Sequence, residues 1–210
     1  ADKKFCHEIT FPPHINRAKK LGYDVVQIPN TVFMMIDHVS PPKDQKTALQ
    51  GKILRDWSKE HIVTFFDTGQ GGIGHVLNHE KGLIGPGETA IMGDSHTCTY
   101  GALGAFSMGV GTTDIGCGVA VGFFLLRPQK VIRVNFSGKL PANVYAKDCI
   151  LILLKVLRER LGKGGAANMV IEFGGNIIEN MSMAGRFTMC NMPIEGGATC
   201  GMVAVDMTTI

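Results

Sequence analysis

Reactive side chains occupy consecutive positions in the segment 93–100, which reads Gly-Asp-Ser-His-Thr-Cys-Thr-Tyr. Asp94, Ser95 and His96 offer a carboxylate, a hydroxyl and an imidazole, which are groups that proteins use to move protons and to bind polar substrates. The segment follows an apolar run, and no Lys or Arg occurs in residues 82–126. We therefore expect a buried, dry site, in which charges and hydrogen bonds act strongly.

A second acid–imidazole pair, Asp37-His38, directly follows the apolar run 32–36. Open α/β sheets bind ligands at strand ends, and a carboxylate next to an imidazole raises its pKa and fixes its tautomer. Those properties suit a general acid. On these residues alone, a solvated turn with a capping histidine is the commoner explanation.

Two hydrolase hypotheses have weaker support. His75 and His79 have the spacing of metal ligands on a helix, but Gly72 and Gly74 argue against a helix there, and the zinc-protease Glu is absent. Ser95 resembles a nucleophile at a turn. However, no His follows position 96, and adjacent residues of a strand point to opposite faces.

Asn191 and Glu195 stand four residues apart, so a helix would place them on one face, where they could hold a polar ligand. An ordinary capping pair explains them equally well. The chain has neither a GxxxxGK[ST] nor a GxGxxG phosphate-binding motif.

Composition indicates an ordinary globular protein, with 210 residues, 45% hydrophobic and 19% charged. The net charge of +3 gives no reason to expect nucleic acid or a membrane as partner. The six cysteines form no CxxC and lie in apolar or glycine-rich surroundings, which favours reduced thiols and a cytoplasmic location. No signal peptide is visible, and the abrupt ends of the sequence, at Ala1 and Ile210, suggest part of a longer protein.

Hydrophobic patterning predicts an α/β protein with a partly parallel sheet. We expect a domain boundary near 127–130, and a helix that Asp148 caps and Gly162 ends. The other predicted elements are helices over 13–21 and 44–60 and strands over 25–28, 32–36, 62–66, 131–136 and 203–205.

Five motifs occur in a fixed order, over residues 35–41, 72–75, 93–97, 109–114 and 188–195. This ordered set resembles the aconitase superfamily, and within it the branch of the isopropylmalate dehydratase and homoaconitase large subunits. The resemblance covers nearly the whole chain. It implies three-layer α/β/α domains with mixed, partly parallel sheets, the first over 1–127 and the start of a second over 128–210.

The resemblance implies a hydro-lyase, which removes water from a hydroxy acid and adds it back at the neighbouring carbon. The substrate best matched is 2-isopropylmalate, in leucine biosynthesis, with homoaconitate, citrate and dimethylmalate as alternatives. It also implies three acid–imidazole pairs, namely Asp37 with His38, Asp94 with His75, and Glu195 with His96. Among these, His38 is the expected acid. The resemblance also assigns the substrate contacts to Ser95, Asn191 and Thr97.

The same resemblance implies a [4Fe–4S] cluster, whose three cysteine ligands we expect beyond Ile210. Cys190 and Cys200 do not match the ligand motif, so we predict no metal ligand in this chain and no activity for the 210 residues alone. A small partner subunit carrying a swivelling domain is also implied. Pro12 stands where relatives of aconitase carry a substrate-binding Gln, and Gly74 where relatives often carry a larger residue.

A different class remains open, because some relatives of this scaffold lack the cluster and act as regulatory or RNA-binding proteins. The small net charge and the absence of a basic stripe in the sequence speak against RNA.

Overall fold

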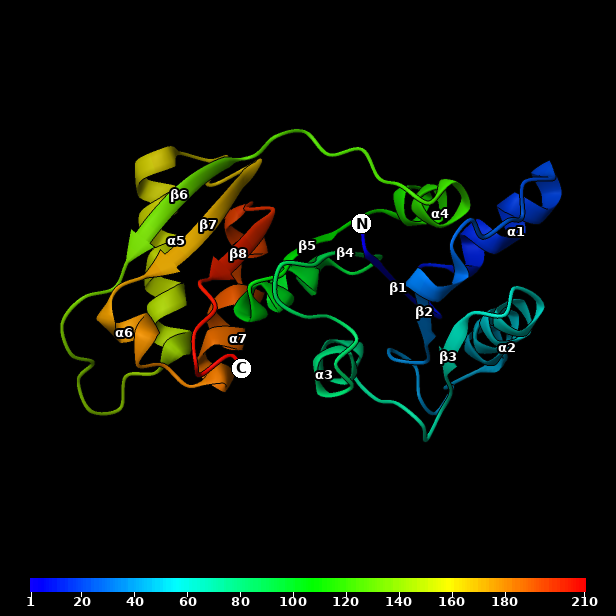
Figure 1. Ribbon diagram of the computed structural model, residues 1–210, viewed down its shortest axis with the longest axis horizontal. Coiled ribbons are helices and arrows are strands. Elements are labelled where there is room, and N and C mark those ends of the chain that lie inside the picture. Colours follow the sequence, from blue (N-terminus) through cyan, green and yellow to red (C-terminus); the bar gives the residue numbers. More distant parts are fainter. The chain divides into compact units, whose positions relative to one another are not determined.

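The computed structural model describes residues 1–210 as two compact units (Figure 1). The first unit contains residues 1–84, 89–94 and 109–126, and the second contains 85–88, 95–108 and 127–210. The chain therefore enters the second unit at 127, next to the boundary expected from the sequence. The segments 85–88 and 95–108 depart from the expected division, because they belong to the second unit. As a result, Asp94 and Ser95 lie in different units.

The first unit is built around parallel strands. Its elements are β1 (Lys3–His7), α1 (Pro12–Leu21), the 3₁₀ turn η1 (Pro29–Thr31), β2 (Val32–Met35), α2 (Gln45–Glu60), β3 (Thr64–Phe66), α3 (Gly74–Glu80), β4 (Thr89–Met92) and α4 (Thr112–Val121). The sheet order is β3-β2-β1-β4-β5, where β5 is Phe106–Gly109. Strand β1 pairs in parallel with both β2 and β4, and β2 pairs in parallel with β3.

The strand order places a topological switch point beside β1. From β1 the chain builds outward to β2 and β3, and then returns to place β4 on the other side of β1. In open α/β sheets, ligands bind at such a point, outside the carboxyl ends of the strands. The register pairs His7 with Met35 at these ends, and Phe5 with Met92. The residues that follow β1, β2 and β4 therefore leave the sheet at one edge.

Local sequence explains where α2 begins and where α1 ends. Asp44 caps α2 through the backbone N–H of Thr47 at 2.8 Å, and Gly22 ends α1 in the left-handed conformation. Phe11 packs edge-on against Trp57, with ring centroids 5.1 Å apart.

The expected strand over 25–28 is wrong. The N–H of Gln27 binds the carbonyl of Val119 instead of a neighbouring strand, so the apolar run serves as a loop.

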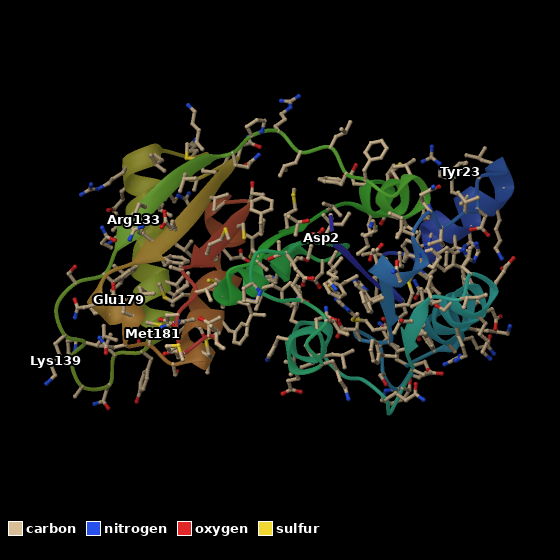
Figure 2. All side chains as sticks on the ribbon, in the orientation of Figure 1. Asp2, Tyr23, Arg133, Lys139, Glu179 and Met181 are labelled. Carbon is tan, nitrogen blue, oxygen red and sulfur yellow. The ribbon has the colours of Figure 1, made fainter.

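The second unit packs helices against a second parallel sheet, of order β6-β7-β8 (Figure 1). Its elements are the 3₁₀ segment η2 (Ser95–Leu103), most of β5, β6 (Lys130–Asn135), α5 (Ala146–Leu161), β7 (Met169–Gly174), α6 (Asn176–Glu179), α7 (Met183–Asn191), the 3₁₀ turn η3 (Pro193–Gly196) and β8 (Cys200–Val203). The core joins Ile150 and Leu153 of α5 to Phe173 of β7 and Met189 of α7. On the solvent-exposed side, Arg133 of β6, labelled in Figure 2, forms an ion pair with Glu172 of β7.

Two sequence expectations for this unit need correction. Tyr145 precedes α5 as its N-cap, and Asp148 lies in the first turn, where its carboxylate accepts the Tyr145 N–H at 2.8 Å. Asp148 thus closes a capping box from inside the helix, while Gly162 ends the helix as predicted. The last strand occupies 200–203 instead of 203–205, because its register follows β7.

After β8 the described residues end in a turn that is held to the second unit. The backbone N–H groups of Thr209 and Ile210 donate to the carbonyl of Asp206 at 2.9 and 3.3 Å. The Asp206 carboxylate in turn pairs with the buried guanidinium of Arg186 on α7 at 2.6 Å. Ile210 itself is 87% exposed, so its side chain adds nothing to the core of this unit.

The α/β class and the parallel sheets predicted from the sequence are confirmed. All six cysteines are free thiols. None of the helices is long and apolar enough to cross a membrane.

Candidate active site

The carboxyl ends of β1, β2 and β4 bring together side chains far apart in sequence. Glu8 follows β1, Asp37 and His38 follow β2, and Asp94 follows β4. Because the strands are parallel and in register, these residues meet at the switch point of the first unit. We call Glu8, Asp37, His38 and Asp94, together with His7 and His75, the acid–imidazole cluster.

His38 lies between two carboxylates. Its Nδ1 is 3.5 Å from Asp37 Oδ2, and its Nε2 is 3.3 Å from Asp94 Oδ2. The hydrogen bond with Asp94 raises the pKa of His38 above its usual value, and the charges of Asp37, Asp94 and Glu8 add to this, against an opposing contribution from burial. The His38 side chain is 39% exposed, whereas Asp37 is 7% and Asp94 13% exposed. The proton-carrying ring is thus the accessible member of the cluster.

Asp94 also contacts a second imidazole. Its Oδ1 is 2.9 Å from Nε2 of His75, so one carboxylate joins two histidines. His75 lies on α3, which forms despite the glycines that argued against a helix. Gly74 starts α3 because a Cβ there would come within 2.6 Å of Met35 Sδ and 2.8 Å of Asp37 Oδ2. A larger residue at position 74 would have to displace the Met35 and Asp37 side chains.

The predicted zinc pair, His75 and His79, belongs to no close set of three or more metal-binding groups in the structure. Nε2 of His75 is held by Asp94, and Nδ1 of His79 lies 2.8 Å from the carbonyl oxygen of His75. Two close sets of metal-binding groups do occur in the structure. They are His7 with Glu8 and His38, and Asp24 with Glu60 and His61.

Those two sets already have protein partners. Both Glu8 oxygens accept backbone N–H groups, and both His7 ring nitrogens have hydrogen-bond partners. Asp24 accepts the Trp57 indole N–H at 2.7 Å, and Glu60 pairs with Lys19 at 2.7 Å. We therefore assign no metal to either set.

Two members of the cluster, His7 and Glu8, were not found from the sequence. The His7 ring stacks on that of His38, with centroids 4.1 Å apart and planes 13° apart. Its Nδ1 accepts the N–H of Ile9, so its proton sits on Nε2, which donates to the Gly93 carbonyl at 3.1 Å. Burial lowers the pKa of His7, and the neighbouring His38 lowers it further. The surroundings thus favour the neutral form of His7 and the charged form of its stacked neighbour His38. The available signal was the His-Glu dipeptide at the end of strand β1.

The second unit holds the remaining acid–imidazole pair. Nε2 of His96 lies 3.2 Å from Glu195 Oε1. The Ser95 hydroxyl lies 3.1 Å from Nδ1 of His96. Adjacent side chains of a strand would point to opposite faces, but Ser95 and His96 begin the 3₁₀ segment 95–103, and the backbone is kinked at His96.

Asn191 supports this pair from α7. Its Nδ2 donates to Thr99 Oγ1 at 2.8 Å, and the Thr99 hydroxyl donates to the carbonyl of His96 at 2.6 Å. Asn191 thus braces the backbone that carries His96. Thr97, expected to contact substrate, is instead fully buried. Its expected contact with substrate stays a prediction.

The cysteines do not fit the ligand set of an iron–sulfur cluster. Burial raises the pKa of Cys6 and Cys190 well above the usual value and that of Cys200 to about 11, which keeps these thiols protonated. Cys117 is exposed, and neither set of close metal-binding groups contains a cysteine. Cluster ligands are thiolates, so the buried Cys6, Cys190 and Cys200 serve as packing groups. The cysteine ligands expected beyond Ile210 lie outside the described residues, so that expectation stays a prediction.

A surface cavity of about 660 Å³ borders Glu195 in the second unit. Lys155, Arg158 and Lys163 line it, together with the glycine turns 164–165 and 196–197. The three cationic side chains are solvent-exposed, which is ordinary for a helix surface, so we assign the cavity no ligand.

The switch-point position and the paired imidazoles and carboxylates define a class, an α/β protein equipped for proton transfer at strand ends. The comparison with family models is specific, because the model described as "Aconitase family (aconitate hydratase)" matches residues 1–210. The chain belongs to the aconitase family, as the ordered motifs indicated.

Curated relatives agree with this assignment. The chain is 50% identical over all 210 residues to the 3-isopropylmalate dehydratase large subunit of Geobacter sulfurreducens, covering 48% of that protein. It is 46% identical over 210 residues to the large subunit of Moorella thermoacetica, covering 49% of it. The Nitratiruptor protein of the same name is 43% identical over 204 residues, covering 48% of it. The chain thus spans about half the length of the relatives it matches.

Proposed function

We propose that this chain supplies the proton-transfer groups of a hydro-lyase that interconverts 2- and 3-isopropylmalate, as part of a large subunit. One observation carries the proposal: His38 stands between the carboxylates of Asp37 and Asp94 and remains partly exposed. An imidazole whose charged form is favoured by two neighbouring carboxylates, at a ligand-binding edge, suits the departure of a hydroxyl group. The names of the curated relatives supply the substrate class.

The residues of this chain account for the proton movements at the oxygen. When the C–O bond breaks, the oxygen takes a proton from the His38 imidazolium and leaves as water, and His38 becomes neutral. Asp37 and Asp94 hold the ring in place and stabilise its charged form. When water adds back at the neighbouring carbon, His38 accepts the proton from it. The base that removes the carbon-bound proton belongs to the part of the protein outside these residues.

The other polar groups have supporting roles in the proposal. Ser95 and Asn191 offer a hydroxyl and an amide, which suit the carboxylate and hydroxyl groups of a hydroxy acid. His96 and Glu195 form a second acid–imidazole pair, and His75 fixes Asp94. Thr97, which is buried and lies next to His96 in sequence, keeps its proposed place among the substrate-binding residues.

Family members bind a [4Fe–4S] cluster, which acts as a Lewis acid toward the substrate hydroxyl. Because the cysteines of this chain do not fit its ligand set, we propose that the ligands lie beyond Ile210 and assign no step to the cluster. The small partner subunit and a cytoplasmic setting belong to the same proposal.

The test uses the full-length protein with its small partner subunit, after anaerobic reconstitution with iron and sulfide. Formation of the unsaturated intermediate from 2-isopropylmalate is followed by ultraviolet absorbance, with citrate, homocitrate and dimethylmalate in parallel. We expect turnover of 2-isopropylmalate and a loss of about 10²–10⁴-fold in kcat for His38→Asn. His61→Gln is the control, because His61 caps α2 away from the cluster. Full activity of the His38 variant would refute the role of His38, and turnover of another acid alone would refute the substrate.

A further inference from the structure

Glu8 is a fully buried carboxylate located beside the turn that carries His38. Its Oε2 accepts the N–H of Asp37 at 3.0 Å, and its Oε1 accepts the N–H of Val39 at 2.6 Å. The two N–H groups flank His38 in sequence, so the Glu8 carboxylate binds the backbone on both sides of His38. A buried carboxylate held only by backbone amides is unusual, because burial of a charge is costly unless it is satisfied.

We propose that Glu8 is a positioning residue for the reaction, and that its carboxylate holds the His38 imidazole in place by binding the backbone on both sides of it. This inference rests on the proposed function of His38. A loose turn would let the ring move relative to Asp37 and Asp94, and misplacement of a proton donor by about 1 Å reduces rates strongly. Glu8 acts through the backbone and does not touch the reacting atoms.

Glu8 also affects the protonation of His38, because it is one of the charged groups around the ring. The groups that face the ring are Asp37 in its own turn, His7 at the end of β1, Glu8 directly after β1, Asp94 after β4, and His75 of α3 through Asp94. Three of them are carboxylates, and the charge of Glu8 contributes to the raised pKa of His38. Loss of Glu8 therefore removes both the two hydrogen bonds to the backbone and one charge that favours the protonated ring.

The variants Glu8→Gln and Glu8→Asp separate positioning from simple support of the fold. Gln can accept at one atom only and carries no charge, while Asp keeps the charge but is one methylene shorter. Glu80→Gln on the exposed surface of α3 is the matched control. Thermal unfolding followed by circular dichroism shows which variants fold, and the readouts below are taken from folded variants.

One readout is independent of activity. Diethyl pyrocarbonate acylates neutral imidazole and spares the imidazolium, so the pH dependence of labelling at His38, mapped by mass spectrometry, reports its protonation. We expect the midpoint to fall in the order wild type, Glu8→Asp, Glu8→Gln, with the Glu80 variant unchanged. In the full-length enzyme, we expect kcat to fall in the same order, by about 10–100-fold for Gln, with KM within about twofold.

The outcomes distinguish this proposal from the proposed function. A folded Glu8→Gln or Glu8→Asp variant with wild-type kcat and labelling midpoint would overturn the role of Glu8, as would a fall in kcat with no change at His38. Absence of isomerase activity in the wild type would remove the proposed function, and the labelling series would still decide whether Glu8 controls His38.

Discussion

Oδ2 of Asp94 lies 3.3 Å from Nε2 of His38, while the other oxygen of the same carboxylate lies 2.9 Å from His75. The family pattern pairs Asp94 with His75, and the structure adds His38 as a second partner. One carboxylate therefore links the exposed imidazole to α3, which makes the protonation of His38 depend on a residue outside its own turn.

Asp94→Asn should lower the pKa of His38, because the variant removes its strongest stabilising hydrogen bond and a negative charge. We expect kcat of the full-length enzyme to fall by about 10²–10⁴-fold and its pH optimum to move to lower pH. The measurement is the pH profile of kcat. Asp114→Asn, in the exposed first turn of α4, serves as control, and an unchanged profile in Asp94→Asn would contradict the linkage.

The free energy of unfolding should depend on pH in part through the titration of His38. Its pKa is raised on folding, so its contribution to stability is complete below about pH 6.5 and is lost as pH rises through the folded-state pKa. His7 and His14 act in the opposite sense, because burial lowers their pKa values. The difference in urea stability between wild type and His38→Asn isolates the contribution.

We expect that difference to decrease as pH rises from 6 to 9, by less than about 1 kcal/mol, because the ring is partly exposed. A difference that grows with pH would show that the folded protein favours neutral His38.

Glu195→Gln should separate activity from stability. The His96–Glu195 pair is 34% and 53% exposed, so its loss should change the free energy of unfolding by less than about 1 kcal/mol. Because Glu195 holds the His96 ring, we expect kcat to fall at least about tenfold. Steady-state kinetics and thermal unfolding check both parts, with Glu159→Gln on α5 as control. Equal loss of activity and fold would mean that Glu195 is structural.

Gly101→Ala tests how η2 is held in the second unit. A Cβ at this position would lie 1.7 Å from the backbone oxygen of Gly201 in β8, which cannot move without breaking the sheet. We expect a loss of about 3 kcal/mol or more in unfolding free energy. Gly72→Ala, where a Cβ meets open space, should change it by less than about 1 kcal/mol. Near-equal stability of the two variants would mean that η2 can shift away from β8.

Much of the local structure could be predicted from the sequence. The four-residue spacing over 44–60 gave α2, and Gly162 marked the end of α5. The errors arose where two interpretations of one pattern compete. The apolar run 25–28 has strand composition but binds α4 as a loop, and Asp148 caps α5 from its first turn. Gly74 argued against a helix in isolation, yet it begins α3 because the neighbouring side chains leave room for nothing larger.

The sequence by itself determined the family, the α/β class and the identity of the reactive groups, because these depend on residue types and on order along the chain. Only the tertiary structure decided which groups meet. The parallel register of β1, β2 and β4 brings Glu8, His38 and Asp94 to one edge, and the 3₁₀ path after Asp94 lets Ser95 contact His96. Such contacts follow from the pairing of distant segments, which no local pattern encodes. The Gly-Asp-Ser-His segment supplies the groups, and the fold gives each of them its partner.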